Sequence, residues 1–137
     1  ELSWPVDKLN SSVMHSEAQA LLGEQDFSTF RAAGCQSKTP YRCVNRCSVD
    51  RFGDFVVLEI EANAFLFHMV RNIASALKDV GQGARTNHIN DLIKKRDRTQ
   101  LGVTAPPSGL YLTKVAYEAY SLPTVNDKPS ILRALSV

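Results

Sequence analysis

Arg71 is the residue whose type and position most clearly demand a chemical partner. It lies in the run Asn63 to Ile73 (NAFLFHMVRNI), which is otherwise strongly apolar and typical of a helix. A guanidinium stays charged at any working pH, and removing it from water is costly unless an anion meets it. No acidic residue lies between Glu61 and Asp79. We therefore expect Arg71 to pair with a carboxylate or phosphate from elsewhere, which its planar fork binds through two hydrogen bonds.

A helical wheel divides this segment into two stripes of side chains. The apolar stripe follows Phe65 and every fourth residue after it. The second stripe consists of Ala64, His68, Arg71, Ser75 and Lys78. It is either the solvated face of the helix, or a low face that lets another element approach Arg71. His68 shares this stripe and is either a packing residue or a contact to a substrate.

Residues 31–51 form a second candidate site, because this stretch contains five basic residues and a single acidic one, Asp50. The basic residues are Arg31, Lys38, Arg42, Arg46 and Arg51. Alternation along the predicted strand places Arg42 and Arg46 on one face. Aromatic residues interleave with this stretch, as is typical of surfaces that bind a nucleic-acid backbone. The alternative is an ordinary solvated β-surface. We take Arg31, Lys38, Arg42 and Arg46 as the candidate RNA contacts.

Other reactive side chains give no recognisable catalytic or metal motif. The histidines and cysteines lack ligand spacing, so we expect no bound metal and reduced thiols typical of a cytoplasmic protein. They are His15, His68, His88, Cys35, Cys43 and Cys47. Gly-rich phosphate loops and nucleophile elbows are also missing from the sequence. The net charge of +2 is too small to name a partner, and no apolar run reaches the length of a membrane span.

These residues require a small α+β domain to position them, with helices on one face of a mostly antiparallel sheet. The chain of 137 residues suits one domain. We expect helices at about 7–22, 64–80 and 87–95, and strands at about 41–51, 55–62 and 110–117. A three-stranded sheet leaves edges that proteins usually cover, which indicates that another half of the sheet lies elsewhere. Residues 124–137 are expected to be a tail that crosses the surface.

Several motifs occur in a specific order and spacing. They are Asp26-Phe27-Ser28-Thr29-Phe30-Arg31, Cys35-Gln36-Ser37-Lys38-Thr39, Asn63-Ala64-Phe65 with His68-Met69-Val70-Arg71-Asn72-Ile73, Arg96-Asp97-Arg98-Thr99 and Gly109-Leu110-Tyr111-Leu112. In this succession the chain resembles the C-terminal half of the TruA family of tRNA pseudouridine synthases. The similarity covers about residues 5–123, and we assign residues 1–123 to that half of the catalytic domain.

The resemblance implies isomerisation of uridine to pseudouridine in the tRNA anticodon arm, at tRNA positions 38 to 40. It implies no cofactor and no metal, a homodimer, and tRNA held in a basic cleft. The family's catalytic aspartate lies in the N-terminal half and pairs with a helix arginine, which corresponds to Arg71 here. An apolar residue that closes the base pocket corresponds to Leu110, with His68 nearby.

The family's Arg-x-Asp-x-Gly motif does not occur in these residues. We therefore expect this chain to be a C-terminal portion that is inactive alone and needs the N-terminal half of the same enzyme. Two other hypotheses stay open. One is a non-enzymatic RNA-binding module that uses the basic hairpin, and the other is an interaction domain that docks a protein at its open sheet edge.

Overall fold

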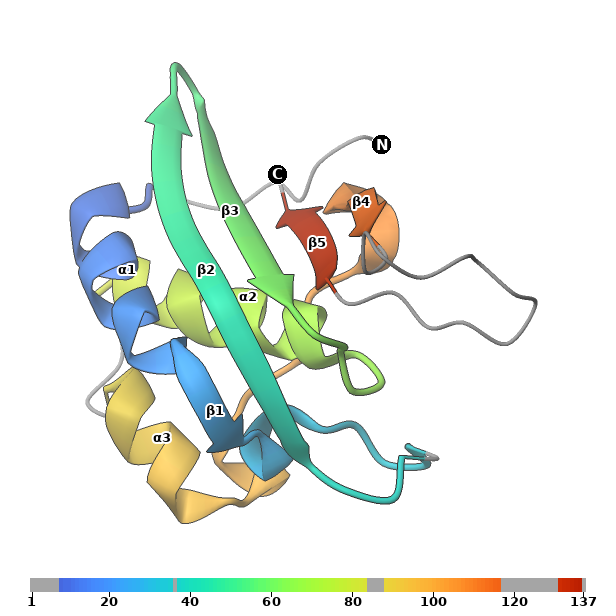
Figure 1. The fold of residues 1–137 in the computed structure, drawn as a ribbon. Helices are drawn as coiled ribbons and strands as arrows, with labels where there is room; N and C mark the ends of the chain where they lie inside the picture. Colours follow the sequence, from blue (N-terminus) through green and yellow to red (C-terminus); the bar gives the residue numbers. More distant parts are fainter. Residues whose placement is uncertain (1–7, 36, 84–87, 117–130, 137) are drawn as a thin grey trace.

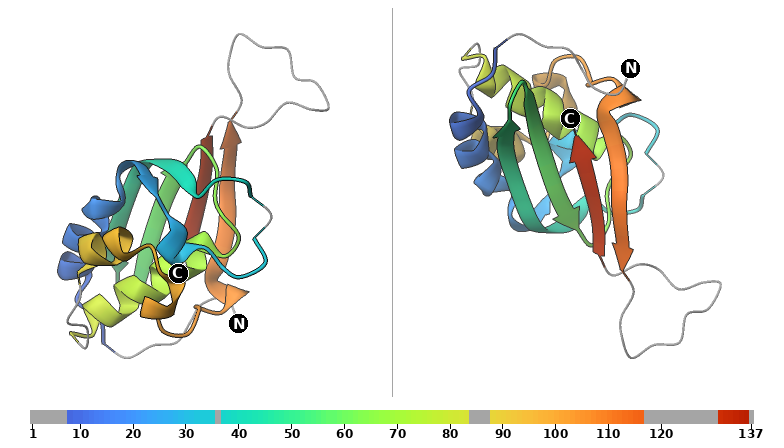
Figure 2. Two further views of the ribbon diagram at one scale, coloured as in Figure 1. Left: turned by 90° about the horizontal axis from the view of Figure 1, so that it is seen from below. Right: turned by 90° about the horizontal axis from the view of Figure 1, so that it is seen from above.

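A computed structural model describes residues 8–35, 37–83, 88–116 and 131–136 of the chain. Within them, five antiparallel strands form one sheet in the order β1-β2-β3-β5-β4, and the three α-helices cover one of its faces (Figures 1 and 2). The strands are β1 (Gly23–Asp26), β2 (Tyr41–Phe52), β3 (Phe55–Ala62), β4 (Leu110–Ala116) and β5 (Ile131–Ser136). The helices are α1 (Ser11–Ala18), α2 (Met69–Gly81) and α3 (Ile89–Lys95). The predicted α+β class is confirmed.

Four short 3-10 turns complete the described elements. They are η1 (Gln19–Leu21), η2 (Ser28–Phe30), η3 (Arg98–Gln100) and η4 (Pro107–Gly109). In two of them a preceding carboxylate accepts a hydrogen bond from a backbone amide of the turn. Asp26 accepts from the Ser28 amide at 2.8 Å, and Asp97 accepts from the Thr99 amide at 3.0 Å. These local bonds satisfy backbone donors at the start of each turn and fix where the chain changes direction.

β2 and β3 form a long hairpin closed by Gly53 and Asp54. Phe52 pairs directly with Phe55, and Gly53 has φ +62°, a left-handed conformation that glycine adopts without steric cost. The hairpin tip extends past the helices in Figure 1. Because the tip precedes β3, it lies at the opposite end of that strand from the segment that leads into α2.

A bulge in β2 changes which side chains share a face. The register shifts between Val44 and Arg46, and the buried residues are Val44, Cys47 and Val49. An extra residue at a bulge moves the following side chains to the opposite face relative to strict alternation. The prediction that Arg42 and Arg46 share one face is therefore wrong. The periodicity of the sequence could not reveal the inserted residue.

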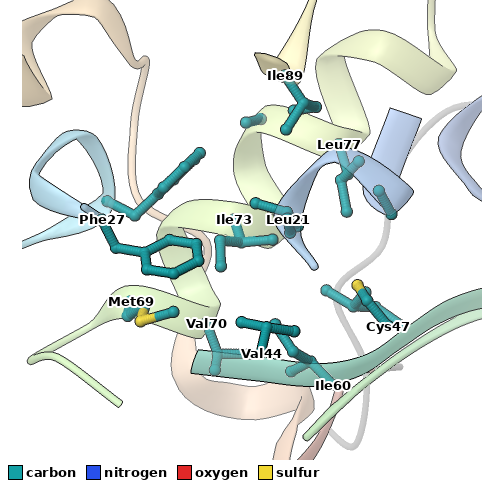
Figure 3. Close-up of a cluster of buried hydrophobic side chains, with 14 of the residues drawn as sticks. Leu21, Phe27, Val44, Cys47, Ile60, Met69, Val70, Ile73, Leu77 and Ile89 are labelled. Carbon is teal, nitrogen blue, oxygen red and sulfur yellow. The ribbon is translucent and has the colours of Figure 1, made fainter. Parts of the chain in front are cut away.

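The core lies between the sheet and the helices (Figure 3). β2 and β3 contribute buried β-branched and leucine side chains, and α2 contributes an apolar stripe with the predicted spacing. The stripe residues Met69, Ile73 and Leu77 are all 0% exposed. Burial of such side chains stabilises the fold by about 1.5–3 kcal/mol each. This packing fixes the rotation of α2 and therefore the direction of its polar residues.

The predicted helix over 64–80 begins only at Met69, so Asn63 lies well before its start and does not cap it. The Asn63 side chain instead accepts a hydrogen bond from the Cys43 amide at 2.9 Å. His68 occupies the position before the helix with φ +59°. Leu66, in the preceding loop, is buried in the core, so the apolar pattern continues through residues that are not helical. That continuity made the start of the helix unreadable from periodicity.

Residues 131–136 form strand β5, which lies between β3 and β4 in the sheet. This differs from the expectation of a surface tail over 124–137. The segment reads ILRALS, whose apolar residues suit a strand, but the preceding prolines and polar residues dominated the sequence pattern. The rest of that stretch lies outside the described residues.

Candidate functional site

The second stripe of α2 faces another part of the same chain rather than open solvent. The Ser75 hydroxyl donates to the Val103 carbonyl at 2.5 Å, and Arg71 Nε donates to the Ala105 carbonyl at 2.7 Å. Ser75 is 3% exposed, which the solvated-face interpretation does not allow. The alternative interpretation, in which another element approaches Arg71, is confirmed. The approaching element is the segment 103–105, which precedes η4 and β4.

Asn72 locks this segment onto the helix from the adjacent side. It is 0% exposed, and its amide nitrogen donates to the Phe30 carbonyl at 2.8 Å. Its amide oxygen accepts from the Thr104 hydroxyl at 2.7 Å, and Thr104 in turn accepts from Arg98 at 2.8 Å. Buried polar groups connected in this way hold one geometry, because each broken bond leaves an unpaired partner. The position of Arg71 therefore depends on three segments far apart in sequence.

A cavity of about 270 Å³ lies beside Arg71 at the start of α2. Its lining is mainly apolar, with one guanidinium and one imidazole. The lining residues are Phe65, Leu66, His68, Met69, Val70, Arg71, Pro107 and Leu110. The structure thus places Arg71, His68 and Leu110 on the wall of one cavity. A small apolar pocket with few polar groups suits one flat ring-shaped group, which the polar atoms would orient.

Arg71 meets no carboxylate among the described residues. Only its Nε has a hydrogen-bond acceptor there, the Ala105 carbonyl. The two terminal nitrogens of the fork are the atoms that bind a carboxylate or phosphate in bidentate geometry. The backbone carbonyl on Nε therefore helps to hold the side chain, while neither terminal nitrogen donates to another described residue.

The surroundings of His68 favour its neutral form. Desolvation lowers its pKa below the ordinary value, and the positive charge of Arg71 lowers it further. Its imidazole stacks on the Phe67 ring, with centroids 3.8 Å apart and 29° between the planes. The positive φ of His68 is uncommon for a residue with a side chain. Uncommon backbone conformations of this kind concentrate at functional sites.

Three of the four candidate RNA-binding residues lie in or beside one loop. Arg31 donates to the Cys35 carbonyl at 3.4 Å and to the Ser37 carbonyl, and Arg42 donates to the Ser37 hydroxyl at 2.9 Å. Lys38 follows directly and is exposed. Arg46 is separate from this group, because it lies on the outer face of the sheet and pairs with Glu59 at 3.8 Å.

The same loop contains Cys35, for which the sequence pattern predicted an ordinary reduced thiol. Hydrogen bonds from the backbone of Phe67 and of Ser37 lower the pKa of its thiol to about 7. Cys47 behaves in the opposite way, since burial raises its pKa to about 12. Phe67 was also missed as a site residue. The predicted helix over 64–80 included it, whereas the structure places it in the loop before α2. Asn72 could have been noticed as a second polar residue in an apolar helix.

No group of three potential metal ligands occurs within the described part of the chain. In the same residues, no helix is both long and apolar enough to span a membrane. The cavity and the loop of residues 31–40, called the basic loop below, are the two places where the structure gathers the predicted site residues.

Comparison with known proteins gives consistent matches. Residues 18–118 match the family model described as tRNA pseudouridine synthase. The chain is 51% identical over 118 residues to tRNA pseudouridine synthase A of Shewanella loihica, which covers 85% of this chain and 45% of the relative. The protein of that name from Buchnera aphidicola is 52% identical over 111 residues, with 80% and 42% covered. The one from Hydrogenovibrio crunogenus is 48% identical over 126 residues, with 90% and 48% covered. The chain thus spans about half the length of the curated relatives it matches.

Proposed function

The chain belongs to the tRNA pseudouridine synthase family, and we propose that the protein it forms part of isomerises uridine to pseudouridine in the anticodon arm of tRNA, at tRNA positions 38 to 40. The observation that carries this proposal is the cavity that joins Arg71, His68 and Leu110. It agrees with the arrangement that the TruA resemblance implies, in which the arginine pairs with the catalytic aspartate and an apolar residue closes the base pocket. The target uridine must leave its base stack to reach such a pocket.

The reaction is an isomerisation, so atoms and electrons balance without a redox partner. The glycosidic bond from C1′ to N1 breaks, a bond from C1′ to C5 forms, and the proton on C5 is replaced by one on N1. An aspartate from the other half of the enzyme would face Arg71. A guanidinium opposite a desolvated carboxylate lowers the carboxylate pKa and keeps it ionised and oriented. The Arg71–Ala105 hydrogen bond holds the fork for this pairing.

This proposal includes partners that the described residues do not contain. The N-terminal half of the same enzyme supplies the aspartate, so the present chain alone is expected to be inactive. Residues 1–123, joined by strand β5, form the C-terminal half of the catalytic domain. The complete protein acts as a homodimer in the cytoplasm, where tRNA is its substrate. Light scattering of the complete protein measures the dimer, and incubation of the isolated chain with unmodified tRNA tests its inactivity.

The experiment that tests the role of Arg71 separates turnover from binding. In the complete protein, Arg71→Ala removes the charge partner of a buried carboxylate, a loss of about 2–5 kcal/mol in comparable pairs. We expect kcat to fall by about a hundredfold or more, while the Kd for tRNA changes by less than about threefold. Arg71→Lys keeps the charge but loses the planar fork, and is expected to recover only part of the activity.

Arg46→Ala is the matched control, because Arg46 has a side chain that is 60% exposed and pairs only at the surface. As a predicted RNA contact away from the cavity, it is expected to weaken tRNA binding and to leave kcat unchanged, the opposite of the pattern expected for Arg71→Ala. Equal losses of turnover and affinity in Arg71→Ala would contradict the proposed role and would mean that Arg71 grips a phosphate.

A non-enzymatic RNA-binding module is the second candidate function, and the cluster of Arg31, Lys38 and Arg42 favours it. Such a module would bind tRNA with an affinity that falls steeply as salt rises, because neutralised phosphates release counterions. Binding of this kind without any pseudouridine product from the complete protein would support this candidate over the enzyme.

A further inference from the structure

Phe67 presents an exposed aromatic ring next to the cavity. The residue is 53% exposed, although large apolar side chains usually avoid water. Its ring does not line the cavity but stacks on His68, which does. The neutral imidazole and the phenyl ring therefore form a continuous aromatic surface, one end of which lies in the cavity and the other in solvent.

The backbone of Phe67 is fixed to the basic loop. Its carbonyl accepts a hydrogen bond from the Ala32 amide at 3.1 Å, and its backbone also bonds the Cys35 thiol. Arg31 holds the other side of this loop through the Cys35 and Ser37 carbonyls. Phe67 thus connects the cavity, through its stacked neighbour His68, with the loop that contains Arg31 and Lys38. Because the surrounding bonds already order the segment, the ring loses little freedom when it binds a ligand.

We propose that the Phe67 ring is a stacking platform for the RNA base adjacent to the uridine that occupies the cavity, an inference that rests on the proposed function. When a base leaves its stack, its neighbour in the strand loses a stacking partner. An exposed aromatic ring replaces that partner for any base, since every base has a π-face. Arg31 and Lys38 belong to the loop that the Phe67 backbone contacts, so they are expected to meet the phosphates of the same strand.

The test replaces Phe67 in the complete protein with residues that keep or remove the aromatic face. Loss of one stacked base typically weakens binding by roughly 5- to 150-fold. We expect Phe67→Leu to lower kcat/KM by about tenfold and Phe67→Trp to keep it within about twofold of the wild type. If another part of the protein covered the Phe67 ring, Phe67→Leu would be more active than Phe67→Trp, because leucine fits a packed apolar contact better than the larger indole does.

Phe55→Leu is the matched control. Phe55 is 52% exposed, nearly the same as Phe67, but it lies at the hairpin tip. The seven residue steps of β3 from Phe55 to Ala62 separate it from the cavity end by roughly 23 Å. Its substitution is expected to leave kcat/KM and the melting temperature unchanged, which controls for the loss of an exposed ring as such.

A second measurement asks whether the ring acts through a neighbouring base. Wild-type and Phe67→Leu proteins are compared on tRNA transcripts with an abasic ribose on the 5′ or 3′ side of the target uridine. One of these substrates should lose the effect of Phe67→Leu, since the stacked base is already gone. An undiminished effect on both substrates, or a leucine variant as active as the wild type, overturns the proposal.

The failure of this inference is distinguishable from failure of the proposed function. If the wild-type protein forms pseudouridine and Phe67→Leu is unaffected, only the stacking platform is wrong. If the wild type forms none, the proposed function is wrong, and the same variants and substrates are compared by tRNA dissociation constant. A loss of affinity that depends on the neighbouring base then supports the platform, and an unchanged Kd overturns it.

Discussion

Replacement of Asn72 by alanine should destabilise the protein more than any comparable polar substitution on its surface. Asn72 is 0% exposed and joins η2 to the segment that carries Thr104. Its removal leaves the Phe30 carbonyl unpaired in the core, at a cost of about 1–3 kcal/mol. The empty volume adds further loss, while the partly exposed Thr104 hydroxyl can turn to water. We expect a total loss of about 3 kcal/mol in the free energy of unfolding.

The assay is equilibrium urea unfolding of the complete protein, followed by circular dichroism. With an m-value of about 2 kcal/mol/M, the expected loss shifts the unfolding midpoint by about 1.5 M. Asn90→Ala is the matched control, because Asn90 is an exposed residue of α3 and its replacement should move the free energy by less than about 0.5 kcal/mol. Two variants with equal midpoints would refute the view that the Asn72 network holds the segment.

The same substitution should reduce turnover as well as stability. The segment 103–105 is held by Asn72 through Thr104 and is also the acceptor of the Arg71 Nε hydrogen bond. A looser segment leaves the guanidinium less well oriented, and misplacement of a catalytic group is costly to rate. Activity of Asn72→Ala measured well below its melting temperature should therefore fall, with tRNA affinity changed less than kcat.

Two further predictions concern thiols and glycines. Alkylation of Cys35 should rise with pH and reach half its maximum near pH 7, because its lowered pKa makes the reactive thiolate available there, whereas Cys47 should stay unmodified in the native protein. Mass spectrometry after timed iodoacetamide treatment measures the modification of both cysteines. A midpoint near pH 9 for Cys35 would contradict the hydrogen bonds to its thiol. Gly81→Ala should lower the melting temperature, since a Cβ there would lie 2.5 Å from the Met14 sulfur. A Cβ at Gly102 would meet nothing within 4 Å, so Gly102→Ala should leave the melting temperature unchanged. Equal melting temperatures of the two variants would show that α2 has room for a side chain at position 81.

The parts of the fold that follow local periodicity were predictable from the sequence. The hairpin of β2 and β3 has β-branched strands and a glycine turn, and the apolar stripe of α2 has clear helical spacing. Both features arise from short-range pattern and are present in the structure within a few residues. The segment 131–136 differs, because its place between β3 and β4 depends on strand pairing over a long distance. The local sequence pattern does not indicate which distant strands pair with each other.

The candidate site was predictable in its residue types but not in its geometry. The helical wheel left open whether Arg71 faces solvent or another element, and the structure shows that the segment 103–105 approaches it. The bulge in β2 separated Arg42 from Arg46, since one inserted residue reverses the faces of a strand. The positive φ of His68 was equally invisible, because backbone conformation at a helix start depends on the packing around it.

The position of β5 has a consequence for the integrity of the cavity. Leu110, the first residue of β4, pairs with Ser136, and β4 borders only β5 among the described strands. Local unfolding of β5 would therefore also release β4 from the rest of the sheet. The wall that Leu110 gives the cavity thus depends on a strand that lies further along the chain and contributes none of the cavity's described lining residues.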